Sequence, residues 1–86
     1  MNTIGIVAAI LTTGAFLPQA LKTIKTKQTD DLSLTTFSMI FIGTILWSFY
    51  GHFIEDNPLL FANVITAFLS GIIVTLKINS MLEAKK

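Results

Sequence analysis

Hydrophobic residues occupy three long uncharged stretches of this chain, and the charged residues gather in the short segments between and after them. The stretches are Ile4–Leu21, Leu32–Ile54 and Pro58–Leu76. At about 1.5 Å of rise per residue, each is long enough for a helix that crosses about 30 Å of hydrocarbon. The pattern predicts an all-α membrane protein with one domain, residues 1–86, and three spanning helices at about 4–24, 32–54 and 58–78.

Composition supports a membrane protein and narrows its chemistry. Hydrophobic residues make up 52% of the chain and charged residues only 13%, and the mean hydropathy is +0.72, which leaves too few charges for the surface of a small soluble domain. There is no cysteine, so disulfides and thiolate metal sites are excluded. The net charge of +1 comes with scattered lysines rather than a concentrated basic face. We therefore expect membrane lipid, and no nucleic acid, metal or cofactor, among the partners.

The placement of lysine predicts how the chain crosses the membrane. Two groups follow the first and third stretches: Lys22, Lys25 and Lys27, and Lys77, Lys85 and Lys86. Because lysines in short loops stay on the cytoplasmic side, the N-terminus is expected outside and the C-terminus in the cytoplasm. The same placement argues against a cleaved signal peptide, whose positive charges precede the apolar run.

Local signals indicate where the second and third helices begin. Asp31 or Ser33 can cap the second helix, since short polar side chains accept hydrogen bonds from the first free amides. For the third helix, Asn57 is the predicted cap and Pro58 the first helical residue.

Each predicted span carries a face of small and polar residues at a spacing of three or four, as one helical face requires. These residues are Gly5, Ala9, Thr12 or Thr13, Phe16 and Gln19; then Gly43, Thr44, Trp47 and Gly51; then Asn63, Thr66, Ala67, Ser70 and Gly71. Helices in lipid associate through small residues and through polar side chains shared across the contact. We expect these faces to form the contacts between helices.

Trp47 and Asn63 lie well inside the second and third spans, and two interpretations of them stay open. Tryptophan usually lies at the membrane interface, and a buried amide without partners costs several kcal/mol. Asn63 can bond a neighbouring helix while Trp47 fills a gap. Alternatively, the pair lines an aqueous cavity for a neutral polyhydroxylated ligand, with sugar-like C–H faces on the indole and hydroxyls on the amide. Three helices cannot surround such a cavity, so this second interpretation predicts two copies.

Pro18 interrupts the hydrogen bonding of the first span. Its ring removes one helical bond and predicts a kink between Gly14 and Pro18, and the adjacent Gln19 can donate to the freed carbonyl. One interpretation is a tolerated membrane proline. The other is a hinge, at which the lysine-bearing end of the helix swings while the opposite end stays packed.

The ordered motifs resemble the bacterial SemiSWEET proteins, the half-size members of the SWEET sugar transporters within the PQ-loop group. The resemblance covers about residues 4–78. It is carried by "LPQ" at the end of the first span, "KTIKTKQTDDLS", "FSMIFIGTILWSFYG" and "LLFANVITAFLSGIIV". A lone Pro-Gln pair is common in apolar helices, whereas the full order of motifs is specific.

The resemblance implies a bundle with the third helix between the first two, and a parallel homodimer with a sugar path on its axis. SWEET transporters are a known example of parallel repeats around an axis along the membrane normal. By the same resemblance, the site residues are Trp47 and Asn63 as sugar contacts, Pro18 and Gln19 as hinge, Tyr50 and Asp56 as outer gate, and Met39 and Phe41 as inner gate. Ile54 stands where relatives place an arginine, so an ion pair with the acid near Asp56 cannot form. A bacterial member is expected in the cell inner membrane.

The leading functional hypothesis is facilitative transport of a mono- or disaccharide, of the glucose or sucrose class, by alternating access. An amino acid transporter is the alternative, but a zwitterionic ligand calls for charged partners that the spans lack. A non-transporting membrane subunit leaves Trp47, Asn63 and Pro18 unrelated to one another. An enzyme is not expected, because no nucleophile and base share one depth and the single histidine, His52, lies near the outer surface. The same lack of titratable groups at mid-depth predicts uniport rather than proton-driven transport.

Overall fold

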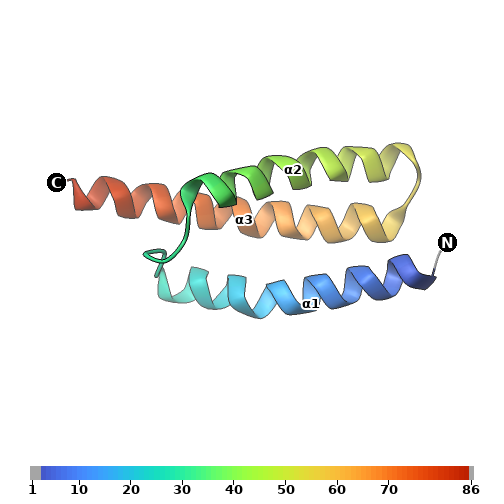
Figure 1. Cartoon of the computed structure of the whole chain (residues 1–86), viewed down its shortest axis with the longest axis horizontal. Helices are drawn as coiled ribbons and strands as arrows, with labels where there is room; N and C mark the ends of the chain where they lie inside the picture. Colours follow the sequence, from blue (N-terminus) through green and yellow to red (C-terminus); the bar gives the residue numbers. More distant parts are fainter. Residues whose placement is uncertain (1–2, 86) are drawn as a thin grey trace.

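In the computed structural model, residues 3–85 form three α-helices joined by two short connections (Figure 1). They are α1 (Thr3–Thr26), α2 (Leu34–Phe53) and α3 (Asn57–Ala84). All three are long and apolar enough to cross a membrane. The predicted all-α, three-span fold is confirmed. Lys86, which the orientation argument used, lies outside the described residues.

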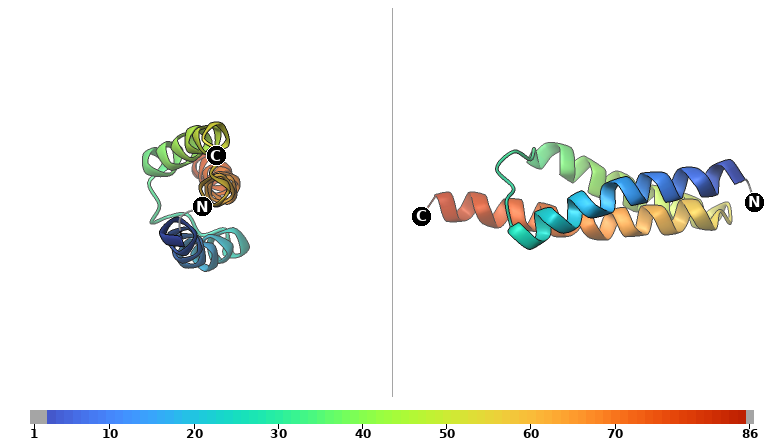
Figure 2. Two further views of the ribbon diagram at one scale, coloured as in Figure 1. Left: turned by 90° about the vertical axis from the view of Figure 1, so that its right-hand side faces the viewer. Right: turned by 90° about the horizontal axis from the view of Figure 1, so that it is seen from below.

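The helices are ordered in space as α1, α3, α2. Helix α3 contacts both of the others, whereas the described parts of α1 and α2 do not contact each other. The end-on view shows α3 set to one side, between the other two helices (Figure 2). The α2–α3 turn is so short that these helices pack as antiparallel neighbours, while the longer α1–α2 connection passes over α3. This is the arrangement that the resemblance implied.

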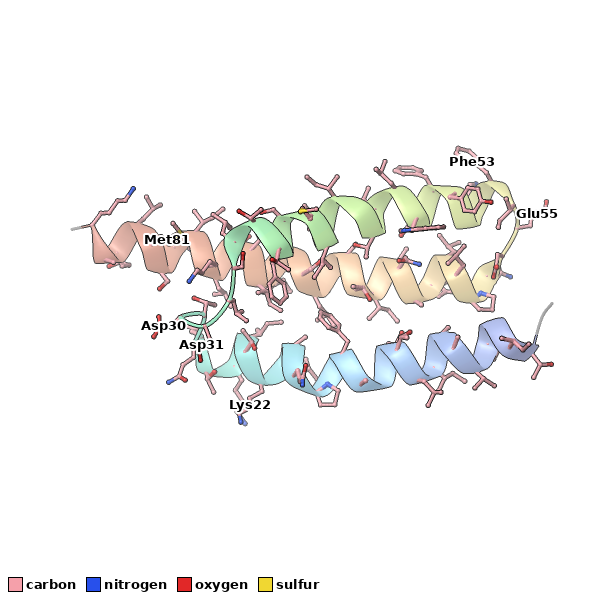
Figure 3. All side chains as sticks on the ribbon, viewed as in Figure 1. Lys22, Asp30, Asp31, Phe53, Glu55 and Met81 are labelled. Atoms are coloured by element: carbon pink, nitrogen blue, oxygen red, sulfur yellow. The ribbon has the colours of Figure 1, made fainter. Side chains whose placement is uncertain are left out.

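The two ends of the bundle differ in charge, and they are named here by their connections. The lysine-rich end contains the α1–α2 connection and Lys22, and the turn end contains the α2–α3 turn and Glu55. Figure 3 shows Lys22, Asp30 and Asp31 at the first end and Glu55 at the second. The charged groups that it labels thus flank the apolar middle of the bundle, as a membrane protein requires.

Capping side chains define where α2 and α3 begin. Ser33 caps α2, its Oγ accepting a hydrogen bond from the Thr36 amide at 3.2 Å, so one of the two predicted caps is confirmed. The prediction for α3 was wrong by one residue. Asp56 is the cap, because its backbone is extended and its Oδ1 accepts from the Leu59 amide at 3.1 Å.

Helices α2 and α3 approach closely at two glycines. A Cβ atom on Gly51 would lie 3.0 Å from the backbone nitrogen of Leu60, and one on Gly71 would lie 2.8 Å from the ring of Phe41. A Cβ on Gly43, by contrast, would meet nothing within 4 Å. The predicted small-residue face of the second span is therefore divided: Gly51 lies in the helix contact, and Gly43 faces open space.

Helix α1 is anchored to α3 at the lysine-rich end. Ala20 of α1 and Leu69 and Ile73 of α3 form the buried cluster, with partly buried apolar residues packed around it: Phe16, Leu17, Ile24, Leu32 and Phe37. In addition, Lys77 of α3 donates from Nζ to the backbone oxygen of Thr29 at 2.8 Å. Burial of apolar area and a charge-assisted hydrogen bond thus hold this end together.

Towards the turn end, α1 and α3 leave a crevice of about 500 Å³ between them. It is lined by Ile6, Ala9, Ile10, Thr13 and Gly14 of α1 and by Asn57, Pro58, Phe61, Ala62 and Ile65 of α3. The hinge interpretation, which stays a prediction, has the lysine-bearing end of α1 swing. That end carries the buried cluster, and the opposite half is the loosely packed one.

Helix α3 continues to Ala84, beyond the predicted end at residue 78. Figures 1 and 2 show its last turns extending past the other two helices. These turns contain Leu82, Glu83 and Ala84, which are good helix formers outside a hydrocarbon environment. Hydropathy marks only the apolar segment of α3, and the helix continues for several residues beyond that segment.

Candidate functional site

Trp47 presents its ring on the open side of α2. Its side chain is 53% exposed, and it contacts Tyr50 edge to face, with ring centroids 5.6 Å apart and an angle of 81° between the planes. These two residues, with Gly43 and Leu46, line an open pocket of about 370 Å³. An aromatic ring that is half exposed does not fill a gap within the protomer. The interpretation that Trp47 fills a gap between helices is therefore not supported within the protomer.

Asn63 lies half-buried on α3 and bonds only within its own helix. Its Nδ2 donates to the Leu59 backbone oxygen at 2.8 Å, four residues back. Among residues 3–85 the structure shows no hydrogen bond from this amide to another helix. The interpretation that Asn63 bonds a neighbouring helix is therefore not supported within the protomer either. The bond that is made leaves the side-chain oxygen as an acceptor for a further partner.

The bundle brings Trp47 and Asn63 to one depth. Trp47 precedes the last residue of α2, Phe53, by six positions, and Asn63 follows the first residue of α3, Asn57, by six positions. Because the two helices are antiparallel neighbours, both side chains lie about 9 Å of helix from the turn end. Asn63 is nevertheless not among the residues that line the Trp47 pocket. One protomer therefore places the two groups at the same level without enclosing a site between them.

Pro18 lies inside α1, which remains helical on both sides of it. The side chain of Gln19 is exposed, and its backbone oxygen accepts a hydrogen bond from Thr23 Oγ1 at 3.0 Å. Within the described residues its side-chain amide makes no hydrogen bond, so the expected bond to the carbonyl freed near Gly14 is absent. The geometry of a helix explains this, since successive side chains are turned by about 100°. Gln19 accordingly projects to the side of that carbonyl.

The residues assigned to the gates by resemblance have different surroundings. Met39 is 69% exposed and follows the helical spacing of Gly43, Leu46 and Tyr50, so it shares their face of α2. Phe41 is half-buried and packs against Gly71 of α3. The two inner-gate candidates therefore point in different directions within this protomer.

At the turn end, the two candidates for the outer gate also differ. Tyr50 is half exposed beside Trp47. The carboxylate of Asp56 is engaged in capping α3, and the neighbouring Ile54 is 49% exposed and offers no charge to it. Asp56 thus has a structural role in the protomer, whatever role it has in closing a path.

Among the described residues, no acidic or basic side chain and no histidine lines the pocket beside Trp47. No cluster of histidine, aspartate and glutamate among residues 3–85 could hold a metal ion. His52 lines a separate groove between α2 and α3, which includes neither Trp47 nor Tyr50. The pocket beside Trp47 therefore offers aromatic and apolar groups and the Tyr50 hydroxyl, which is the chemistry of a site for a neutral ligand.

Comparison with known proteins identifies the family. A family model described as the PQ loop repeat matches residues 1–60. The sugar transporter SemiSWEET of Leptospira biflexa is 48% identical, over 91% of this chain and 92% of that protein. The sugar transporter SemiSWEET of Bradyrhizobium diazoefficiens is 40% identical, over 88% of each. Both relatives are transporters, which agrees with the prediction that the chain is not an enzyme.

Solved structures give the same result. A crystal structure of SemiSWEET in the inward-open conformation superimposes with a TM-score of 0.90 at 35% identity, covering 99% of this chain and 95% of that one. A crystal structure of a bacterial homologue of SWEET transporters superimposes with a TM-score of 0.74 at 46% identity, covering 88% and 92%. The chain is an integral membrane protein of the PQ-loop family and belongs, within it, to the SemiSWEET proteins.

Proposed function

We propose that this chain moves a mono- or disaccharide across the inner membrane by facilitated diffusion, as a parallel homodimer that alternates between two open states. The observation that carries the proposal is the level placement of an exposed indole and a half-buried amide, Trp47 and Asn63, in a chain whose curated relatives are named sugar transporters. The glucose or sucrose class fits this pair, since the C–H face of a sugar stacks on an aromatic ring and its hydroxyls bond to an amide.

A second copy of the chain supplies what the protomer lacks. Met39, Gly43, Leu46 and Tyr50 repeat at a spacing of four, three and four on one face of α2, and the pocket beside Trp47 is open on this side. A second protomer related by a twofold axis would close that side and bring a second Trp47 and Asn63 to the same depth. The lysines near the α1–α2 connection would then face the cytoplasm in both copies.

Alternating access follows from unequal packing of α1. Its lysine-rich half is held by the buried cluster around Ala20, and its other half borders the open crevice along α3. Pro18 lies within the anchored part, between Leu17, which packs against that cluster, and Ala20. Movement of the part of α1 that precedes Phe16 would open and close the turn end, and opening of the lysine-rich end would require the cluster around Ala20 to separate. The protomer also superimposes on a relative described as inward-open.

Uniport is the coupling mode that the residues support. Proton-driven carriers need a group within the membrane that changes its charge during the cycle. The charged residues that Figure 3 labels lie at the ends of the bundle, and His52 lines a groove that includes neither Trp47 nor Tyr50. A neutral ligand can then only equilibrate across the membrane.

The test is uptake of labelled glucose and sucrose into proteoliposomes that contain only this chain. Trp47→Ala and Asn63→Ala should each lower uptake by about tenfold or more, since each lost contact is worth about 1–2 kcal/mol and the dimer loses it twice. Phe68→Ala and Asn79→Ala are matched controls, because both side chains are exposed on α3, away from the Trp47 pocket.

Three outcomes count against the proposal. Uptake of both sugars by the two site variants at the normal rate would show that Trp47 and Asn63 only pack. Uptake of labelled amino acids without uptake of sugars would favour the alternative substrate class. No uptake of any solute by a correctly folded dimer would favour a non-transporting subunit.

A further inference from the structure

A groove with an apolar floor and a polar mouth runs between α2 and α3 at the turn end. The floor, of about 380 Å³, is lined by Ile45, Ser48, Phe49, His52, Leu60, Val64 and Ala67. The mouth, a polar pocket of about 630 Å³, is lined by His52, Phe53, Glu55, Asn57 and Leu60. The two share His52 and Leu60, so they form one continuous groove.

The floor requires an apolar occupant. The hydroxyl of Ser48 already donates to the Thr44 backbone oxygen at 2.7 Å, so the polar side chain that the floor still offers is His52, which it shares with the mouth. It extends along α2 from Ile45 to His52, which corresponds to about 10 Å of helix. This is a shape for part of a hydrocarbon chain that lies parallel to the two helices.

The mouth requires a polar occupant that carries a positive charge. Glu55 lies exposed in the α2–α3 turn, and Figure 3 shows it at that end of the bundle. No hydrogen bond to its carboxylate is found within the described residues, whereas the neighbouring Asp56 uses its carboxylate to cap α3. The Glu55 carboxylate at the mouth therefore attracts a cation. His52 and Asn57 can donate hydrogen bonds to phosphate oxygens in the same pocket.

The φ of Glu55 is 57°, in the left-handed region, directly after Ile54, the C-cap residue of α2. Glycine occupies this position most comfortably, because a Cβ atom there is strained. The turn therefore tolerates conformational strain while it places a carboxylate at the mouth of the groove.

We propose that this groove binds a phospholipid with a primary ammonium headgroup, of the phosphatidylethanolamine class. One acyl chain lies on the floor between α2 and α3, the ammonium meets the Glu55 carboxylate, and the phosphate accepts from His52 and Asn57. A choline headgroup has no N–H to donate to the carboxylate, and an anionic headgroup lacks the ammonium that balances the charge of Glu55. The groove shares no residue with the pocket beside Trp47, so it is separate from the sugar path.

The experiment is native mass spectrometry of the purified full-length chain, with phosphatidylethanolamine, phosphatidylcholine or phosphatidylglycerol added at equal concentration. We expect occupancy by the ethanolamine lipid to exceed that by either other lipid by about fivefold or more. Glu55→Gln should abolish this preference. Asp30→Asn, a matched change of an exposed carboxylate at the lysine-rich end, should leave it intact.

Two further variants separate binding from folding. Glu55→Gly relieves the strained backbone, so it should raise the unfolding temperature of lipid-free protein and still remove the preference. Val64→Trp fills the floor and should lower occupancy by all three lipids, whereas Phe68→Trp, which lies in neither part of the groove, should not.

Equal occupancy by the three lipids would overturn the proposal, since that is the behaviour of lipid that merely surrounds the protein. Preference for the anionic lipid, or a preference that survives Glu55→Gln, would overturn the role of the carboxylate. Loss of dimer rather than of bound lipid in Val64→Trp would assign the groove to a second copy of the chain. None of these readouts involves sugar uptake, so the proposed transport function stands or falls separately.

Discussion

Replacing Gly51 by alanine should destabilise the fold although alanine is the better helix former. The added Cβ would lie 3.0 Å from the backbone nitrogen and 3.2 Å from the Cα of Leu60, and both are main-chain atoms that cannot rotate away. The start of α3 must therefore move by a few tenths of an ångström. Overpacking of this kind costs about 1–3 kcal/mol, against a gain of about 0.8–1 kcal/mol in helix propensity.

Gly43→Ala is the matched control, since it lies in the same helix and its Cβ meets nothing within 4 Å. It should stabilise the chain by about the propensity term alone. Because that term is common to both variants, the difference between their unfolding free energies isolates the packing cost, about 1–3 kcal/mol.

Unfolding by a denaturing detergent can be followed through Trp47, the single tryptophan of the chain. Helix content by circular dichroism serves as a second probe in the same titration. If both alanine variants shift the midpoint upward by the same amount, α2 and α3 do not approach at Gly51 and the packing argument is refuted.

Three further predictions concern the hinge, the lysine-rich end and coupling. Pro18→Ala restores a helical hydrogen bond, so the protein should fold but transport slowly while still binding sugar; parallel loss of binding in a titration would contradict a hinge. Lys77→Met removes the donor to the Thr29 carbonyl, worth about 1.5–3 kcal/mol, so amide exchange in residues 27–33 should accelerate while α2 is unaffected. Sugar counterflow in proteoliposomes should not depend on an imposed pH gradient; accumulation that collapses with a protonophore would implicate His52.

The fold was predictable because the bilayer sets the length of each apolar stretch. Hydropathy located α1, α2 and the start of α3, and cap chemistry located Ser33. Hydropathy cannot tell a lipid-facing residue from a packed one, since both are apolar. The anchoring of α1 at Ala20, the crevice along its other half, and the separation of Gly43 from Gly51 therefore had no sequence signal.

The candidate site stays a prediction: its residue types stand out in the sequence, whereas their arrangement in space does not. A tryptophan and an asparagine at mid-span stand out against an apolar background, so Trp47 and Asn63 could be selected. Their equal depth depends on where α3 begins. The cap of α3 was predicted at Asn57 and lies at Asp56, so the sequence alone locates this start only to within a residue. The bond from Lys77 to Thr29 joins positions 48 residues apart, so no local sequence pattern predicts it.

Among residues 3–85, the small and polar side chains predicted to join the helices make no hydrogen bond from one helix to another, contrary to the expectation from their faces. Instead, polar side chains of the spans donate to a backbone oxygen four residues back in the same helix: Thr12 to Ala8, Thr44 to Ile40, Ser48 to Thr44, Asn63 to Leu59, Thr66 to Ala62 and Ser70 to Thr66. In lipid this satisfies the hydroxyl or amide without a partner helix, so the contacts of these side chains with α3 depend on shape alone.

Contacts without directional bonds can shift by small steps while apolar area stays buried. The bond from Lys77 to the Thr29 carbonyl does cross between segments, and it lies at the lysine-rich end, where α1 is also packed. In the transport cycle that we propose, motion is therefore least costly in the part of α1 that precedes Phe16, beside the level at which Trp47 and Asn63 lie.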